Sequence, residues 1–197
     1  DILSKVHKSC KASNEDIINA VSGIDLTPVQ KARIHVIQKH MDQVNENINE
    51  INKLIDIMAK PFEDDINFLC QIPGVKRDSA IVILSEIGND MERFQTARRI
   101  TSWAGLTPMN NQSAGKKKSV KISRAGVYLK PCLVEVAHAA IKDKEHPYYA
   151  NKFNKISKRR GKKRAYIAIA RKILIAIYHM LLTGEVWNPR DLSDTET

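Results

Sequence analysis

Residues 27–60 read TPVQKARIHVIQKHMDQVNENINEINKLIDIMAK, and the spacing of their apolar side chains is the strongest structural signal in this chain. The apolar residues recur at alternating intervals of three and four: Ile34, Ile37, Met41, Val44, Ile48, Ile51, Ile55 and Met58. Nearly every other position is polar. A narrow stripe of this kind is typical of the a/d seam of a coiled coil. With Thr27 as N-cap and Pro28 in the first turn, the pattern predicts one long helix.

That helix lies in residues 1–60, which we expect to form a helical and coiled-coil region. The seam is too narrow for burial in a large core, so we predict that it pairs with another helix and makes the protein a homo-oligomer. Packing against residues 1–26 of the same chain is the alternative. Asp1 stands where an initiator methionine would be, which favours interpreting the chain as a fragment.

The rest of the chain also favours helices, because aromatic residues are only 6% and Gly and Pro are sparse. Helix start and stop signals predict helices over residues 13–22, 62–70, 77–87, 96–104, 123–140, 148–160 and 163–182. Residues 105–115 are expected to be irregular. We predict a mainly all-α protein, in which the coiled-coil helix precedes a helical domain over 61–190, with a disordered tail over 191–197.

A helix-hairpin-helix motif is predicted at residues 66–88, around the turn Ile72-Pro-Gly-Val75. Such a turn exposes backbone N–H groups, and the second helix presents its N-terminal dipole to a DNA phosphate. Gly74, Lys76 and Arg77 are therefore candidate DNA-binding residues. The alternative is a plain helical hairpin that packs into the core.

The net charge of +10 is distributed unevenly along the chain. Residues 1–91 hold 10 Lys and Arg against 14 Asp and Glu, a net −4, whereas residues 92–197 hold 22 against 8, a net +14. This excess predicts a polyanionic partner for the C-terminal half. The candidate phosphate contacts are Lys116, Lys117, Lys118, Lys121, Arg124, Lys158, Arg159, Arg160, Lys162, Lys163 and Arg164. A solvated basic surface without a partner is the alternative.

A membrane is not an expected partner. No apolar run is expected to approach the length of a membrane span, and no signal peptide is visible, so a cytoplasmic location is predicted. The three cysteines, Cys10, Cys70 and Cys132, are widely spaced and are expected to be reduced, buried thiols.

Ser113 is the candidate catalytic residue. It lies in a run of small and polar residues, Gln112-Ser-Ala-Gly115, and the lysines of 116–118 follow at once. A serine hydroxyl is a poor nucleophile unless it is activated, and nearby cations can neutralise the charge that builds on a phosphodiester under attack. Ser119 and Ser123 compete with it, but we expect both to cap the helix that follows.

Other catalytic groups are scarce. No histidine has metal-ligand spacing, and Glu63-Asp64-Asp65 is expected to be a solvated first-turn cluster, so no metal site is predicted in this chain. His138 either acts as a base for Ser113 or lies on a helix face without a role. The absence of a Gly-x-x-x-x-Gly-Lys motif argues against an ATPase. Trp103 and Tyr128 either stack on bases or pack in the core.

The segment around Ser113 resembles the C-terminal transposase domain of the insertion-sequence one-ten family, bacterial transposases described as bridge-RNA-guided recombinases. The resemblance covers about residues 66–142, and more loosely extends to 182. It rests on Gly105-Leu-Thr-Pro108, Gln112-Ser-Ala-Gly115, Lys121-Ile-Ser-Arg-Ala-Gly126, Tyr128-Leu129, Ile72-Pro-Gly-Val75, Glu86-Ile-Gly88, Phe94 and Leu106.

The family resemblance implies a reaction, ligands and a further domain that the residues alone do not indicate. Ser113 matches the serine that cleaves DNA in the family and forms a covalent phosphoserine link. Family members bind guide RNA and two DNAs as dimers or tetramers. They also have an N-terminal RuvC-like domain whose four acidic residues hold divalent metal, expected to be magnesium. No such domain is evident here, so this fragment would bind DNA and supply the nucleophile without cleaving alone.

Two functions remain open at the level of the sequence. The first is the C-terminal part of a bacterial, nucleoid-associated DNA recombinase with Ser113 as its nucleophile. The second is a non-catalytic module for DNA binding and oligomerisation.

Overall fold

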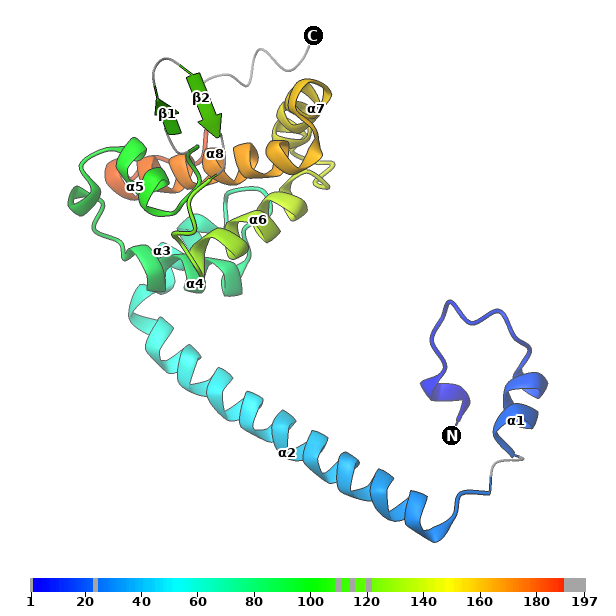
Figure 1. Ribbon diagram of the computed structural model, residues 1–197. Helices are drawn as coiled ribbons and strands as arrows, with labels where there is room; N and C mark the ends of the chain where they lie inside the picture. Colours follow the sequence, from blue (N-terminus) through cyan, green and yellow to red (C-terminus); the bar gives the residue numbers. More distant parts are fainter. Residues whose placement is uncertain (1, 23–24, 109–110, 114–115, 120–121, 190–197) are drawn as a thin grey trace. The chain divides into compact units, whose positions relative to one another are not determined.

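The computed structural model describes residues 2–22, 25–108, 111–113, 116–119 and 122–189, with the backbone alone in the two segments 111–113 and 116–119. The chain divides into two compact units, unit 1 over Asp1–Met58 and unit 2 over Ala59–Thr197. Figure 1 shows that helices are the main elements of both units, so the prediction of a mainly all-α protein is confirmed.

Unit 1 contains the 3-10 turn η1 (Leu3–Lys5), the helix α1 (Asn14–Ser22) and most of the helix α2 (Pro28–Ala59). The start of α2 is a capping box. The Thr27 N–H donates to Gln30 Oε1 at 2.8 Å, and the Gln30 N–H donates back to Thr27 Oγ1 at 3.3 Å. The long helix and its cap were therefore both predicted correctly.

The seam of α2 is open to solvent along its whole length. Every one of its eight apolar residues is exposed; Ile48, for example, retains 48% of its accessible surface. Such a stripe is costly to leave in water, since each buried large apolar side chain stabilises a fold by about 1.5–3 kcal/mol. The single chain leaves this seam without cover, and pairing with a second helix stays a prediction.

Unit 2 is a helical domain with one short β-hairpin. Its elements follow in the order η2 (Lys60–Phe62), α3 (Glu63–Leu69), α4 (Arg77–Ile87), η3 (Glu92–Phe94), α5 (Ala97–Trp103), β1 (Asn111–Ser113), β2 (Lys116–Ser119), α6 (Leu129–Ala140), α7 (Tyr148–Arg160) and α8 (Lys162–Thr183). Most of the predicted helices are present within a residue or two. The hairpin was not predicted.

The helix α8 is the centre of unit 2. It packs against α5, α6 and α7, and Figure 1 shows it running between them. Its inward stripe is fully buried and comprises Ala165, Ile169, Ala170, Ile173, Leu174 and Ile177. Gly184, in the left-handed conformation at φ +71°, ends the helix as predicted.

The expectation that no segment reaches the length of a membrane span is wrong for α8. This helix has 22 residues and a mean hydropathy of 1.6 over its most apolar window, and so meets the criteria of length and composition. Its inward stripe is, however, buried against other helices of the same unit. The position of α8 in the core therefore accounts for its hydropathy.

The turn between α3 and α4 packs against α6. Gly74 has φ +86°, and a Cβ at this position would lie 2.7 Å from the Val136 carbonyl oxygen and 2.8 Å from the Ala140 Cα. Pro73 and Val75 on either side are buried. Glycine is therefore needed at position 74 for both its backbone conformation and its close contact with a neighbouring helix.

The cysteines differ from their prediction in burial. All three are free thiols, but Cys10 is exposed, and Cys70 and Cys132 are only partly buried. Burial is the main cause that raises the pKa of the Cys132 thiol to about 11, and it also raises that of Cys70. Cys132 is therefore protonated, and chemically inert, at neutral pH.

Candidate nucleic-acid site

Ser113 lies at the end of a β-strand rather than in an irregular loop. β1 and β2 pair antiparallel, with Ser113 opposite Lys116 and Gln112 opposite Lys117 (Figure 1). A bulge between Asn111 and Gln112 shifts the register, so that Asn111 lies opposite Ser119. Because residues 114 and 115 alone separate the strands, Ser113 and Lys116 flank the connection. The pairing brings a hydroxyl residue directly opposite a cationic one.

The two ends of the hairpin segment are held together by glycines. Gly105 ends α5 with φ +67°, and a Cβ there would lie 2.6 Å from the Ala125 carbonyl oxygen. Gly126 has φ +66°, and a Cβ there would lie 2.9 Å from the Ala104 carbonyl carbon and still closer to its oxygen. We call the two close backbone contacts, Gly105 with Ala125 and Gly126 with Ala104, the glycine clamp. It brings residues that lie more than 20 positions apart in the chain into backbone contact.

Two further interactions support the base of the hairpin. Pro108 and Ile122 form an isolated antiparallel bridge between the clamp and the strands. The Lys130 ammonium donates to the Ser123 carbonyl oxygen at 2.7 Å and to the Ala125 carbonyl oxygen at 2.8 Å. In the sequence, Lys130 is one of several cations that follow Ser113. In the structure it ties the segment after β2 to α6.

The start of α6 differs from its prediction: it was predicted at Ser123 and is observed at Leu129. The positive φ of Gly126 is incompatible with a right-handed helix, so the helix begins only after this residue. The capping roles expected for Ser119 and Ser123 are therefore wrong. Ser119 ends β2, and the Ser123 Oγ accepts a hydrogen bond from the Ala125 N–H at 3.2 Å.

The cations of the predicted site fall into two groups on unit 2. The first follows Ser113: Lys116, Lys117 and Lys118 lie on β2, Arg124 is exposed beyond it, and Lys121 lies outside the described residues. The second is the α7–α8 basic cluster, defined here as Lys158, Arg159, Arg160, Lys162, Lys163 and Arg164.

All six side chains of the α7–α8 basic cluster are exposed. Three of them occupy the last turn of α7, where cations interact favourably with the helix dipole. The other three occupy the first turn of α8, where the positive end of the dipole of α8 disfavours each cation by about 0.3–1 kcal/mol. The first N–H groups of a helix have no partner within the helix and also carry partial positive charge. A phosphate bound at the start of α8 would interact favourably with these groups and with the three cations.

The three residues predicted to bind DNA through the helix-hairpin-helix, Gly74, Lys76 and Arg77, differ in their exposure to solvent and in their contacts. Lys76 is exposed at the start of α4, where its N–H donates to Ser79 Oγ at 2.9 Å. Arg77 is half-buried and forms an ion pair with Glu63 at 3.0 Å between Nη2 and Oε2. Gly74 faces α6, as described above. Two helices, α3 and α4, flank the turn, but the assignment as a helix-hairpin-helix and its use in DNA binding stay predictions.

The acidic cluster at the start of α3 does not form a metal site. Glu63 is paired with Arg77, and Asp65 accepts a hydrogen bond from Asn89 Nδ2 at 3.0 Å. Across the described residues, no group of three or more His, Cys, Asp or Glu side chains is arranged to hold a metal ion. The residues present here therefore do not fit the divalent metal that the family resemblance implies.

His138 lies in an aromatic stack. Its ring is 3.6 Å from that of Tyr166, centroid to centroid, and the two planes are inclined by only 19°. Tyr166 in turn contacts Phe153 at 4.6 Å. This stack was missed by sequence analysis, because its members come from three different helices. The role of His138 as a base for Ser113 stays a prediction.

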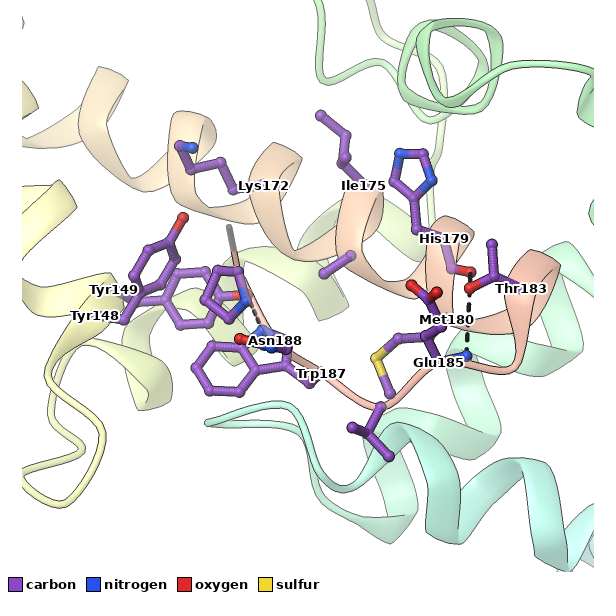
Figure 2. Close-up of a pocket in the computed structure, with 13 residues that line it drawn as sticks. Tyr148, Tyr149, Lys172, Ile175, His179, Met180, Thr183, Glu185, Trp187 and Asn188 are labelled. Atoms are coloured by element: carbon purple, nitrogen blue, oxygen red, sulfur yellow. Dashed lines mark hydrogen bonds between the residues drawn. The ribbon is translucent and has the colours of Figure 1, made fainter. Parts of the chain in front are cut away.

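A cavity lies elsewhere in unit 2. This pocket has a volume of about 420 Å³ and lies between α8, the first turn of α7 and the segment 185–189. Figure 2 shows the residues that line it. Trp187 anchors that segment through a hydrogen bond from its Nε1–H to the Tyr149 hydroxyl at 3.1 Å. None of the predicted site residues lines this pocket.

Two comparisons relate this chain to known transposases. Residues 66–153 match the model of the family described as "Transposase IS116/IS110/IS902 family". The chain is 28% identical over 183 residues to the transposase for insertion sequence element IS1111A of Coxiella burnetii (strain RSA 493 / Nine Mile phase I). That alignment covers 87% of this chain but 47% of the relative, so the chain spans about half the length of the curated relative that it matches.

Proposed function

We propose that this chain, whose residues 66–153 match the model of the IS116/IS110/IS902 transposase family, binds DNA and supplies Ser113 as the nucleophile for strand cleavage and exchange. The observation that carries this proposal is the hairpin register, which places Ser113 opposite Lys116 beside the connection of β1 and β2. The glycine clamp gives that hairpin a fixed base. Catalysis needs a nucleophile on such a positioned support.

The proposed reaction is a transesterification. The Ser113 oxygen attacks the scissile phosphorus, a P–O ester bond to serine forms, and the P–O bond to one DNA strand end breaks. The serine proton is lost to a base, and the departing strand end gains a proton and leaves as a hydroxyl. Attack by a hydroxyl of another strand on the phosphoserine reverses these steps and completes exchange. The lysines of β2 would neutralise charge on the phosphate in both steps.

A divalent metal, with magnesium as the expected ion, would belong to a RuvC-like acidic domain outside these residues. Glu63 and Asp65 interact with Arg77 and Asn89, and the described residues hold no metal-binding group of His, Cys, Asp or Glu, so no step is assigned here to a metal. We therefore propose that the chain taken alone binds nucleic acid but does not cleave it. Guide RNA is a second proposed ligand, because a basic surface that contacts phosphates accepts either polymer. The proposed location is the bacterial cytoplasm, on the nucleoid.

DNA binding through the α7–α8 basic cluster predicts a strong dependence on salt. The triple variant Lys158→Gln, Lys162→Gln, Lys163→Gln is expected to weaken duplex binding. It should also lower the slope of log affinity against log salt by about 0.9 for each DNA phosphate that the variant no longer neutralises. Filter binding at several salt concentrations measures both quantities.

A matched control removes the same charge from unit 1. The triple variant Lys31→Gln, Lys39→Gln, Lys53→Gln changes three exposed lysines of α2 and should leave the salt slope unchanged. Equal slopes for the two triple variants would contradict a specific role for the cluster.

The exposed seam of α2 supports a second part of the proposal, self-association through a coiled coil. Ile48→Asp would place a carboxylate in the centre of the seam, where burial of an unpaired charge is strongly unfavourable. We expect a lower oligomeric mass in sedimentation velocity. Asn49→Asp creates the same residue one position away from the seam and should leave the mass unchanged. A wild-type protein that is already monomeric would contradict the coiled coil.

A further inference from the structure

The aromatic stack of unit 2 runs from the core to the surface. Phe153 of α7 is buried, Tyr166 of α8 is half-buried, and His138 of α6 is exposed. Tyr166 contacts both of the other rings, at 4.6 Å and 3.6 Å between centroids. The innermost ring is therefore held by the core, and each ring supports the next one outward.

The outermost ring of this stack is in an unusual position for a surface histidine. His138 lies almost parallel to Tyr166, at 19°, which fixes the orientation of the imidazole, and yet the residue remains exposed. An isolated surface side chain is normally free to rotate and loses entropy when it binds a ligand. The stack has already fixed this ring, so a flat partner can add to it at a lower entropic cost.

Exposed lysines lie near the members of the stack in the sequence. Lys142 lies four residues after His138, just past the end of α6, and Lys162 and Lys163 lie one turn before Tyr166 on α8. Side chains three or four residues apart share a helix face. The stack therefore has cations within reach, whereas Glu135, one turn before His138, disfavours a phosphate on that side of α6.

We propose that His138, supported by Tyr166 and Phe153, is a stacking platform for an unpaired nucleobase of single-stranded nucleic acid, with Lys142, Lys162 and Lys163 holding the adjoining phosphates. A fixed aromatic ring beside cations is the combination that binds single strands without reading their sequence. Bases within a duplex are already stacked on one another and do not offer a free face. The inference rests on the proposed function, because it refines how this protein binds nucleic acid.

The test compares three labelled probes of equal length by fluorescence anisotropy: single-stranded oligo-dT, the same strand with its central bases replaced by abasic sites, and a duplex. The abasic strand keeps its phosphates and lacks only the bases. Wild-type protein is expected to bind the abasic strand about 5- to 150-fold more weakly than oligo-dT. His138→Ala should bind both single strands with that same weaker affinity, and its affinity for the duplex should be unchanged.

Two more variants separate a stacking role from a merely structural one. His138→Phe retains a flat ring on Tyr166 and should keep the preference for oligo-dT over the abasic strand. Tyr166→Ala removes the support and should lose that preference. Tryptophan fluorescence checks that each variant is folded, because both tryptophans, Trp103 and Trp187, lie in unit 2. An oligo-U probe in a parallel titration distinguishes RNA from DNA as the tighter ligand.

The outcomes that would contradict the stacking platform differ from the outcome that would contradict the proposed function. If His138→Ala still prefers oligo-dT to the abasic strand as strongly as the wild type, the stacking platform is wrong, whatever the duplex affinity. A loss of the same size on the duplex would also overturn it, since bases are not free there. If wild-type protein binds none of the probes, the proposed function itself fails.

Discussion

Ser113→Ala in the full-length protein is expected to abolish the covalent link to DNA while DNA binding is retained. The serine oxygen is the atom that forms the new phosphate ester, and alanine has no atom to replace it. Loss of a covalent nucleophile lowers the rate by a factor on the order of 10⁴ to 10⁶. The assay contains metal, guide RNA and DNA. The adduct is detected by gel mobility under denaturing conditions, and mass spectrometry identifies the modified residue.

Two variants serve as controls for this experiment. Ser119→Ala removes the other hydroxyl of the hairpin and should leave the adduct largely intact. Tyr128→Phe tests the strongest competing nucleophile, because Tyr128 retains 71% of its accessible surface and follows directly after the glycine clamp. An adduct that persists in Ser113→Ala, or that maps to Tyr128, would overturn the serine mechanism. No adduct in any protein would favour the non-catalytic binding module.

Gly126→Ala is expected to be the most destabilising of the conservative substitutions in the glycine clamp. Alanine at φ +66° costs about 1–2 kcal/mol in backbone strain. Its Cβ would also overlap the Ala104 carbonyl group, which is backbone and has no alternative rotamer. Overpacking of this kind adds about 1–3 kcal/mol, for a total of about 2–5 kcal/mol. Urea unfolding followed by tryptophan fluorescence reports on unit 2 and measures the change.

Gly184→Ala separates the two parts of that cost. Gly184 has a similar φ of +71°, but a Cβ at this position would meet nothing within 4 Å. This variant should therefore lose only about 1–2 kcal/mol, the backbone strain, and the difference between the two variants measures the contact in the clamp. Equal destabilisation by both substitutions would show that the clamp contact contributes nothing.

Local signals in the sequence were enough to locate most helices. The alternating spacing of apolar residues predicted α2, and the capping box at Thr27 and Gln30 formed at its start. Gly184 predicted the end of α8. These signals work because a helix is stabilised by contacts three and four residues apart, and because its caps use neighbouring side chains.

The errors in prediction have a common cause in contacts between distant residues. The start of α6 was placed six residues too early, because the apolar pattern and the serines permit a helix from Ser123. The positive φ of Gly126, at a position in close contact with Ala104, prevents it. The hairpin was missed for a related reason, since the polar and cationic residues of β1 and β2 have no alternating apolar pattern.

The sequence by itself determined the helical class, the apolar seam of α2, the concentration of positive charge in the C-terminal half and the choice of Ser113 as candidate nucleophile. The tertiary structure alone decided that Ser113 lies opposite Lys116, that Gly74 faces α6, and that His138 stacks on Tyr166. The physical reason is that composition and helix periodicity depend on near neighbours. The position of a side chain in a site depends instead on which distant backbones pack closely enough to hold it.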